Sequence, residues 1–221
     1  MGCHQGIDFA VAGSRRSPGR SPTAILQPSP AQYDDATLAA AFRDLHGPRL
    51  HGFAILVTLG DQQLAERVAG FSLAAGARQA AALRHPERAA AWLRARTLRA
   101  LHEPRAPGRS TPVEARRAAL ATLGVDESVY HGLAALGIDA RAALVASAIE
   151  RFDPIDVETI LAAAPAATRH AVAEARSRYM RFAVKGSGEE AGPAPDEPIG
   201  ELAARVQEVS ARAFSTGDEP R

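Results

Sequence analysis

The stretch 133–182 constrains the fold more than any other part of the chain, because prolines and aspartates divide it into three short helices. Each helix begins at residues that favour a helix start: Asp139 for the helix to Ile149, Asp153 with Pro154 for the helix to Ala162, and Pro165 for the third. The residues expected to face the core recur at helical spacing: Leu144, Ala148 and Ile149, then Val157, Ile160 and Leu161, and finally Val172, Ala175 and Tyr179.

The third helix of this stretch is basic on the side away from its apolar face. The polar side chains expected to project outward are Thr168, Arg169, His170, Arg176, Arg178 and Arg181. A short helix, a tight turn and a longer basic helix form the helix-turn-helix pattern, in which the second helix lies in the major groove of DNA. The alternative is an ordinary three-helix bundle with an arginine-rich face in solvent.

The first half of the chain predicts four helices between Asp34 and Glu103. Their expected boundaries are a cap at Asp34-Asp35, a break at Gly47-Pro48, a turn at Gly60-Asp61 and a start at Pro86-Glu87. The inward residues expected are Leu38, Phe42 and Leu45; Leu50, Phe53, Ala54 and Val57; Leu64, Val68 and Phe71 or Ser72; and Trp92, Leu93, Leu98 and Leu101.

Proline, glycine and serine mark the boundary between two expected domains at 104–112. After it, Pro112 and Asp126 each begin a helix. The predicted fold is all-α, with two small helical domains on a flexible linker. Its segments are a disordered tail at 1–33, a first domain at 34–103, the linker at 104–112, a second domain at 113–183, a polar linker at 184–196 and an amphipathic helix at 197–214. That last helix is expected to dock on a domain or in a partner's groove.

The order of residues in the second domain resembles region four of the extracytoplasmic-function (ECF) sigma factors. The matching positions are Leu136-Gly137, Arg141, the apolar run 142–149, Asp153-Pro154-Ile155-Asp156-Val157, Leu161, Thr168-Arg169-His170 and Ala175-Arg176. The chain departs from the family's pattern at Glu158, where a small residue is usual, and at Ala167. The resemblance implies that Thr168, Arg169, His170 and Arg176 contact promoter DNA.

The first domain is similar to region two of the same family. The matching positions are Arg49-Leu50, Phe53-Ala54, Gly60-Asp61, the run 65–70 and Trp92-Leu93. The resemblance implies that Glu66, Arg67 and Gly70 face core RNA polymerase. At two of these positions the family carries an acidic residue and a glutamine, so Arg67 inverts the charge and Gly70 removes a side chain.

The segment between Arg78 and Arg117 is the most basic part of the chain, with ten arginines against three glutamates. Such a local excess suits contact with phosphates, although the formal net charge of the whole chain is only +1. By the resemblance, Arg94, Arg96 and Arg99 are the DNA-contacting residues here. Trp92 is expected in the core rather than stacked on a base.

Composition argues against several other classes of protein. One cysteine excludes an internal disulfide framework, and the seven histidines show no metal-ligand spacing. The sequence contains no phosphate-binding glycine loop and no nucleophile in a strained turn, so we expect no enzyme, no cofactor, no catalytic residues and no metal site. Without a long apolar run or a signal core, a cytoplasmic protein without a membrane partner is expected.

Two functions follow from the sequence. The first is an ECF-type sigma factor that directs RNA polymerase to promoters and supports transcription initiation. The second is a sigma-like regulatory protein without stable polymerase binding, which acts as a decoy for an anti-sigma protein or as a plain helix-turn-helix regulator. The order of landmarks favours the first function, whereas Arg67, Gly70 and Glu158 favour the second.

Overall fold

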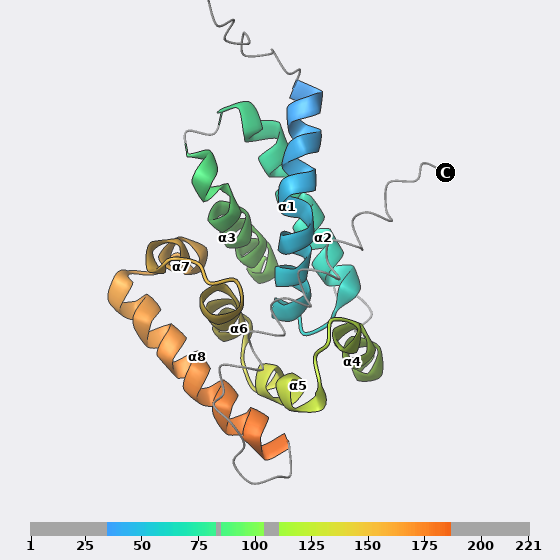
Figure 1. Ribbon diagram of the computed structural model, residues 1–221, viewed down its shortest axis with the longest axis vertical. Helices are drawn as coiled ribbons and strands as arrows, with labels where there is room; N and C mark the ends of the chain where they lie inside the picture. Colours follow the sequence, from blue (N-terminus) through green and yellow to red (C-terminus); the bar gives the residue numbers. More distant parts are fainter. Residues whose placement is uncertain (1–34, 83–84, 104–110, 187–221) are drawn as a thin grey trace, which may run out of the picture. The chain divides into compact units, whose positions relative to one another are not determined.

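The computed structural model describes residues 35–82, 85–103 and 111–186, and within these ranges it is helical and contains no strand (Figure 1). The long helices are α1 (Asp35–Val57), α2 (Gln62–Gln79), α3 (Ala89–His102), α4 (Val113–Thr122), α5 (Glu127–Ala134), α6 (Ile138–Leu144), α7 (Pro154–Leu161) and α8 (Pro165–Gly186). The short turns are η1 (Ala80–Ala82), η2 (Pro86–Arg88) and η3 (Val145–Ile149), the last a π-helical continuation of α6. The all-α class is therefore confirmed for the described residues. The expected tail at 1–33 and the amphipathic helix at 197–214 lie outside them.

The expected break at Gly47-Pro48 is wrong, because α1 runs through both residues as one helix. Proline removes one backbone hydrogen bond and typically costs about 3 kcal/mol inside a helix. Gly47, Leu50 and Phe53 are all buried, and α1 packs along α2, so tertiary burial outweighs that local cost. The continuous helix also turns Leu45 away from the core, and its side chain is 70% exposed rather than buried.

The turn between α1 and α2 is held by backbone geometry and by a cap. Gly60 has φ +80°, and a Cβ atom there would lie 2.3 Å from the carbonyl oxygen of Arg116 in α4. Asp61 follows the expected turn and caps α2, accepting a hydrogen bond of 3.1 Å from the backbone N–H of Leu64. Its other carboxylate oxygen lies 3.3 Å from Nη2 of Arg116. The helix that follows the expected linker thus packs directly against this turn.

The two expected domains share one hydrophobic core in the part of the chain that the structure describes. Helix α3 packs on α7, and α1 packs on α6 (Figure 1). Between the latter two, Nε of Arg141 donates a 2.8 Å hydrogen bond to the carbonyl oxygen of Val57, which α1 leaves unpaired at its end. The expected pair of domains on a flexible linker is therefore not confirmed, because apolar and polar groups of each half are buried by the other. Residues 104–110 of that linker lie outside the described ranges.

Most helix starts in the second half follow the sequence. The side chain of Asp126 accepts a 2.8 Å hydrogen bond from the backbone N–H of Val129, and Pro154 and Pro165 begin α7 and α8. Asp139 is an exception, since α6 begins one residue earlier, and its carboxylate instead lies 2.8 Å from Nε2 of His102. Helix α8 extends through Gly186, beyond the expected domain end at 183.

Gly132 allows α8 to lie close to α5. A Cβ atom at this glycine would lie 2.5 Å from Cε2 of Tyr179, whose ring is buried between the two helices. Burial, and then the charge of Asp126, raises the pKa of Tyr179 to about 12. This contact fixes the middle of α8 on the core, together with the buried Ala175 one turn earlier.

Gly132→Ala should therefore lower the free energy of unfolding by about 1–2 kcal/mol, because overpacking outweighs the gain in helix propensity. Gly70→Ala is the matched control. Gly70 is exposed within α2, and a Cβ atom there meets nothing within 4 Å, so this change should stabilise the protein by about 0.5–1 kcal/mol. Urea unfolding followed by circular dichroism measures both values. Equal effects at the two glycines would contradict the packing argument.

Two histidines of α1 should make stability depend on pH. Burial, and then the charges of Arg94 and Arg49, lowers the pKa of His46, and burial lowers the pKa of His51 against the opposing charge of Glu66. The folded state thus prefers neutral imidazoles, whereas the unfolded chain takes up protons as the pH falls through about 6.5. The free energy of unfolding should be fully retained above pH 6.5 and should fall below it.

Urea unfolding at about pH 7.5 and about pH 5.5 measures this dependence. A variant with His46→Gln and His51→Gln should lose less stability between the two conditions than the natural chain. The same loss in both proteins would show that other groups control the pH dependence.

Candidate nucleic-acid interface

Helices α6, α7 and α8 contact one another and form one packed unit (Figure 1). Helix α7 ends at Ala162, which has φ +50° and ψ +41° in the left-handed region, and the chain then turns into α8 at Pro165. Val157 and Ile160 of α7 and Ala175 of α8 are buried in the core of the unit. The apolar sides of both helices are thus used internally, and one side of α8 remains outward.

The structure separates the four expected DNA-contacting residues of α8. Arg169, His170 and Arg176 are exposed, and Nε2 of His170 lies 3.8 Å from a carboxylate oxygen of Glu174. Thr168 was expected on the same outward side but is only 4% exposed. Thr168 lies in the first turn of α8 on its core side, and its backbone N–H donates a 2.9 Å hydrogen bond to the carbonyl oxygen of Ala164. The outward side therefore offers arginine guanidinium groups, which bind phosphates and guanine edges.

Arg94 was expected to contact DNA, but the described structure buries its side chain. The residue is 1% exposed, and its Nε and Nη2 donate hydrogen bonds to the two carboxylate oxygens of Glu150 in a bidentate ion pair. Its Nη1 donates a 2.9 Å hydrogen bond to the carbonyl oxygen of Ala90. A guanidinium group held in this way cannot reach a phosphate unless α3 and the segment that carries Glu150 move apart.

Two aromatic rings enclose the same guanidinium group. The Cζ atom of Arg94 lies 5.7 Å from the centroid of Phe53 and 4.8 Å from that of Phe152. Phe53 belongs to α1 and Phe152 follows η3, so the charge of Arg94 lies between the two halves of the chain. The rings exclude water and favour the cation through their negative faces.

Arg88 forms a second polar connection between the halves. From the end of η2, its Nε donates a 3.0 Å hydrogen bond to Oδ1 of Asp156 in α7. Its Nη2 donates to Oγ1 of Thr159 at 2.9 Å and to the carbonyl oxygen of Ile155 at 3.3 Å. This arginine is half-buried, so its charge is partly neutralised inside the chain.

The other two expected arginines of α3 remain nearer the surface. Arg99 is exposed. Arg96 is half-buried, with its Cζ atom 4.9 Å from the centroid of the Phe71 ring and 5.6 Å from that of Trp92. The sequence left open whether Phe71 or Ser72 faces the core. Ser72 is fully buried and Phe71 is 51% exposed, so Ser72 faces the core. Trp92 is half-buried against the core, as the sequence suggested.

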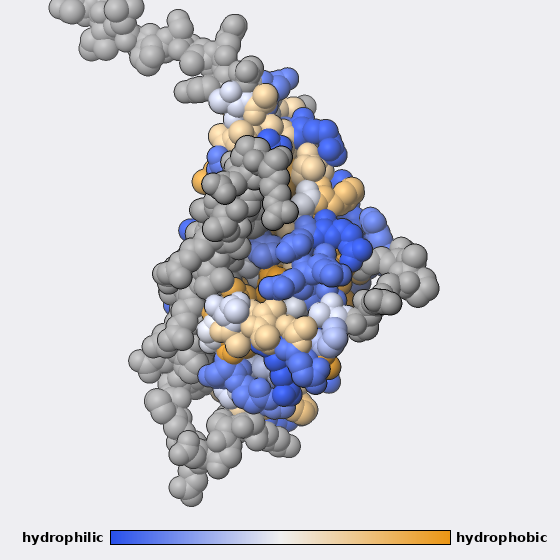
Figure 2. Space-filling model, turned by 90° about the vertical axis from the view of Figure 1, so that its right-hand side faces the viewer, coloured by the Kyte–Doolittle hydropathy of each residue, from blue (hydrophilic) through white to orange (hydrophobic). Residues whose placement is uncertain are grey.

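The residues expected to face polymerase all lie on the outward side of α2. Glu66, Arg67 and Gly70 are exposed. Figure 2 views the molecule from the side on which α2 and α4 lie, and much of the coloured surface there is hydrophilic. The side chain of Arg67 therefore presents a positive charge to any partner of this surface.

The sequence did not predict the carboxylates that form ion pairs with the arginines of η2 and α3. Glu150 and Asp156 lie 56 and 68 residues from Arg94 and Arg88 along the chain, a separation that no helical periodicity connects. One signal in the sequence pointed to Glu150: it directly follows an apolar run, and a carboxylate next to buried residues needs a basic partner to stay charged.

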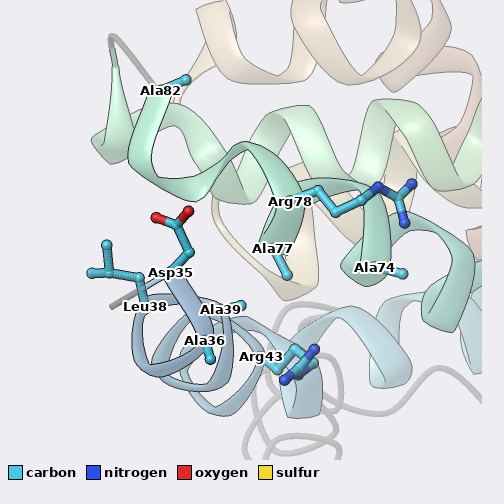
Figure 3. A pocket seen from close by; sticks show the side chains of 9 residues that line it. All are labelled: Asp35, Ala36, Leu38, Ala39, Arg43, Ala74, Ala77, Arg78 and Ala82. Carbon is cyan, nitrogen blue, oxygen red and sulfur yellow. The ribbon is translucent and has the colours of Figure 1, made fainter. Parts of the chain in front are cut away.

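The described residues also form a pocket away from α8. The pocket between the start of α1 and the end of α2 is lined by alanine side chains and by Leu38, Asp35, Arg43 and Arg78 (Figure 3). Its arginines are exposed, and alanine methyl groups offer no hydrogen bonds. Across these ranges no three histidine, cysteine or acidic side chains come close enough to hold a metal ion, and none of the helices is long and apolar enough to cross a membrane.

Comparison of the chain with protein-family models, with curated proteins and with solved structures finds no match. The function of this surface has to be inferred from its residues and from their order in the sequence.

Glu150→Gln should lower the free energy of unfolding by about 3–5 kcal/mol, because it leaves the buried charge of Arg94 without a counter-charge. Glu127→Gln is the matched control, since Glu127 pairs with Arg117 at 3.2 Å on the surface, where both side chains are about half exposed. That change should alter stability by less than about 1 kcal/mol. Denaturant titrations of both variants measure the difference. A small effect of Glu150→Gln would show that the Arg94 pair is not tightly coupled to folding.

Proposed function

We propose that the chain is an ECF-type sigma factor that acts in the cytoplasm, binds promoter DNA and directs RNA polymerase to initiate transcription there. The observation that carries this proposal is the placement of Arg169 and Arg176, seven residues and about two turns apart, on the outward side of α8 in a helix-turn-helix order. The apolar sides of α6, α7 and α8 are buried in the core, so the arginines on the outward side of α8 are not required for folding.

The chemistry of α8 suits a duplex. An arginine can bind the O6 and N7 atoms of guanine with two hydrogen bonds, or clamp a phosphate. Arg178 and Arg181 are also exposed on α8 and add to the positive field that attracts a phosphate backbone. By the resemblance to region two, Arg96 and Arg99 of α3 would follow the backbone of the same promoter farther along.

The alternative function is a sigma-like regulator that forms no stable complex with core polymerase. Two observations favour it: the positive charge of the exposed Arg67 on α2, and the close packing of α3 against α7. In that case the chain acts by binding DNA alone or by binding an anti-sigma protein.

Arg169→Ala should weaken binding to a duplex that the protein selects from a random pool by about 1–3 kcal/mol, or roughly 5–150-fold. If Arg169 contacts a phosphate instead, the slope of log Kd against log salt should decrease by about 0.9 with only a modest change in sequence preference. Fluorescence anisotropy over a salt series measures both quantities. Arg43→Ala on α1 is the control, because Arg43 is exposed and lies on another element. Equal losses for the two variants would contradict a specific role for α8.

Affinity capture of purified core RNA polymerase distinguishes the two functions. The sigma-factor proposal requires a stable complex, which Glu66→Arg on the outward side of α2 should weaken. Sequence-selective DNA binding without any polymerase complex would exclude the sigma-factor proposal and support the alternative.

A further inference from the structure

We infer that the contact of α3 with α7 is a conformational latch, in which Arg88 and Arg94 are held by carboxylates of the chain itself and are released to a polyanion when α1–α3 separate from α5–α8. The inference rests on the proposed function for the identity of that polyanion, a nucleic-acid strand. It goes beyond that function because it assigns a closed state and states what opens it.

The two ion pairs lie at opposite ends of one contact. Arg88 pairs with Asp156 and Arg94 pairs with Glu150, so the order along one segment is reversed along the other. Arg94 lies six positions after Arg88, a rise of about 9 Å along a helix axis. A contact held at two points in this way has a defined register and can close in only one arrangement.

The groups that hold the latch are the groups that a phosphate backbone would compete for. Guanidinium groups bind carboxylates and phosphates through the same planar pair of N–H donors. In the closed state the donors of Arg94 point at Glu150 and Ala90, and those of Arg88 point at α7. A nucleic-acid strand can bind these two arginines only in the open state, so it stabilises that state by differential affinity.

The two ion pairs are the part of this contact that a polyanion can compete for, whereas the apolar core that the halves share favours closure. Taking the charges of Arg94 and Glu150 out of water offsets much of their mutual attraction, and both charges regain hydration when the halves separate. The aromatic rings of Phe53 and Phe152 and the hydrogen bond from Arg141 to Val57 still favour closure. The balance between the closed and open states therefore depends on the shared apolar core and on what competes for the arginines.

The test uses the full chain with Cys3→Ser and a fluorophore pair on Ala74→Cys in α2 and Ser177→Cys in α8, both exposed positions. In this background, Glu150→Gln with Asp156→Asn removes both counter-charges and keeps the side-chain sizes. Energy transfer should fall in the double variant, while the helical circular dichroism signal is retained. Asp156→Asn alone, at the less buried pair, should give a smaller fall and serves if the double variant does not fold.

Binding to a random-sequence single-stranded DNA oligonucleotide provides the second readout. Each phosphate contact on a single strand adds about 0.7 to the magnitude of the slope of log Kobs against log salt, so two released arginines should add about 1.4. Adding Arg88→Ala to the double variant should remove about 0.7 of that gain. Glu127→Gln, which removes a counter-charge from the surface pair with Arg117, is the control and should change neither energy transfer nor slope.

Unchanged energy transfer in the variants that fold would overturn the inference, because the ion pairs would not be holding the halves together. A fall in energy transfer without a steeper salt slope would overturn it as well, since the released arginines would then bind no polyanion. Failure of the proposed function gives a different result: no duplex sequence is selected by any variant, whatever the energy transfer shows.

Discussion

The ion pair of Arg94 with Glu150 is the interaction on which the rest of the structure depends. Arg94 is the largest fully buried side chain among the residues that the structure describes, and a charge in that position is tolerated only with a counter-charge and hydrogen bonds. Glu150 follows the π-helical turn η3, and Phe152 covers the guanidinium group from the same segment. The counter-charge and the hydrogen bonds of Arg94 therefore fix the positions of α3, η3 and the start of α7 relative to one another.

That constraint divides the arginines of the chain into two groups with different uses. Arg88, Arg94 and Arg141 donate hydrogen bonds across the boundary between α1–α3 and the later helices. Burial lowers the pKa of Arg141, and the charge of Arg116 lowers it further. The arginines of α8 lie on its outward side instead. A basic stretch of sequence is thus no measure of the basic surface, because part of its charge is neutralised within the fold.

Local chemistry could be predicted from the sequence, and tertiary pairing could not. The helix starts at Asp61 and Asp126 follow the sequence, because a cap needs only its neighbours within one turn. The stop at Pro48 failed because burial of α1 against α2 outweighs the local preference of proline. Arg94 was misplaced because its partner lies 56 residues away and the helical repeat of α3 carries no trace of it.

The prevalence of arginine over lysine in this chain has a structural consequence at position 94. A lysine there would present one compact, strongly hydrated ammonium group, which cannot reproduce the planar fork onto Glu150 and the bond to Ala90 in the same geometry. It would also lose the stacking of a flat cation against Phe53 and Phe152. A guanidinium group is less hydrated, so it can move between a buried carboxylate and an exposed phosphate with a smaller change in solvation. Weak hydration thus stabilises the buried Arg94 in the closed state and also lowers the cost of its transfer to a phosphate in the open state.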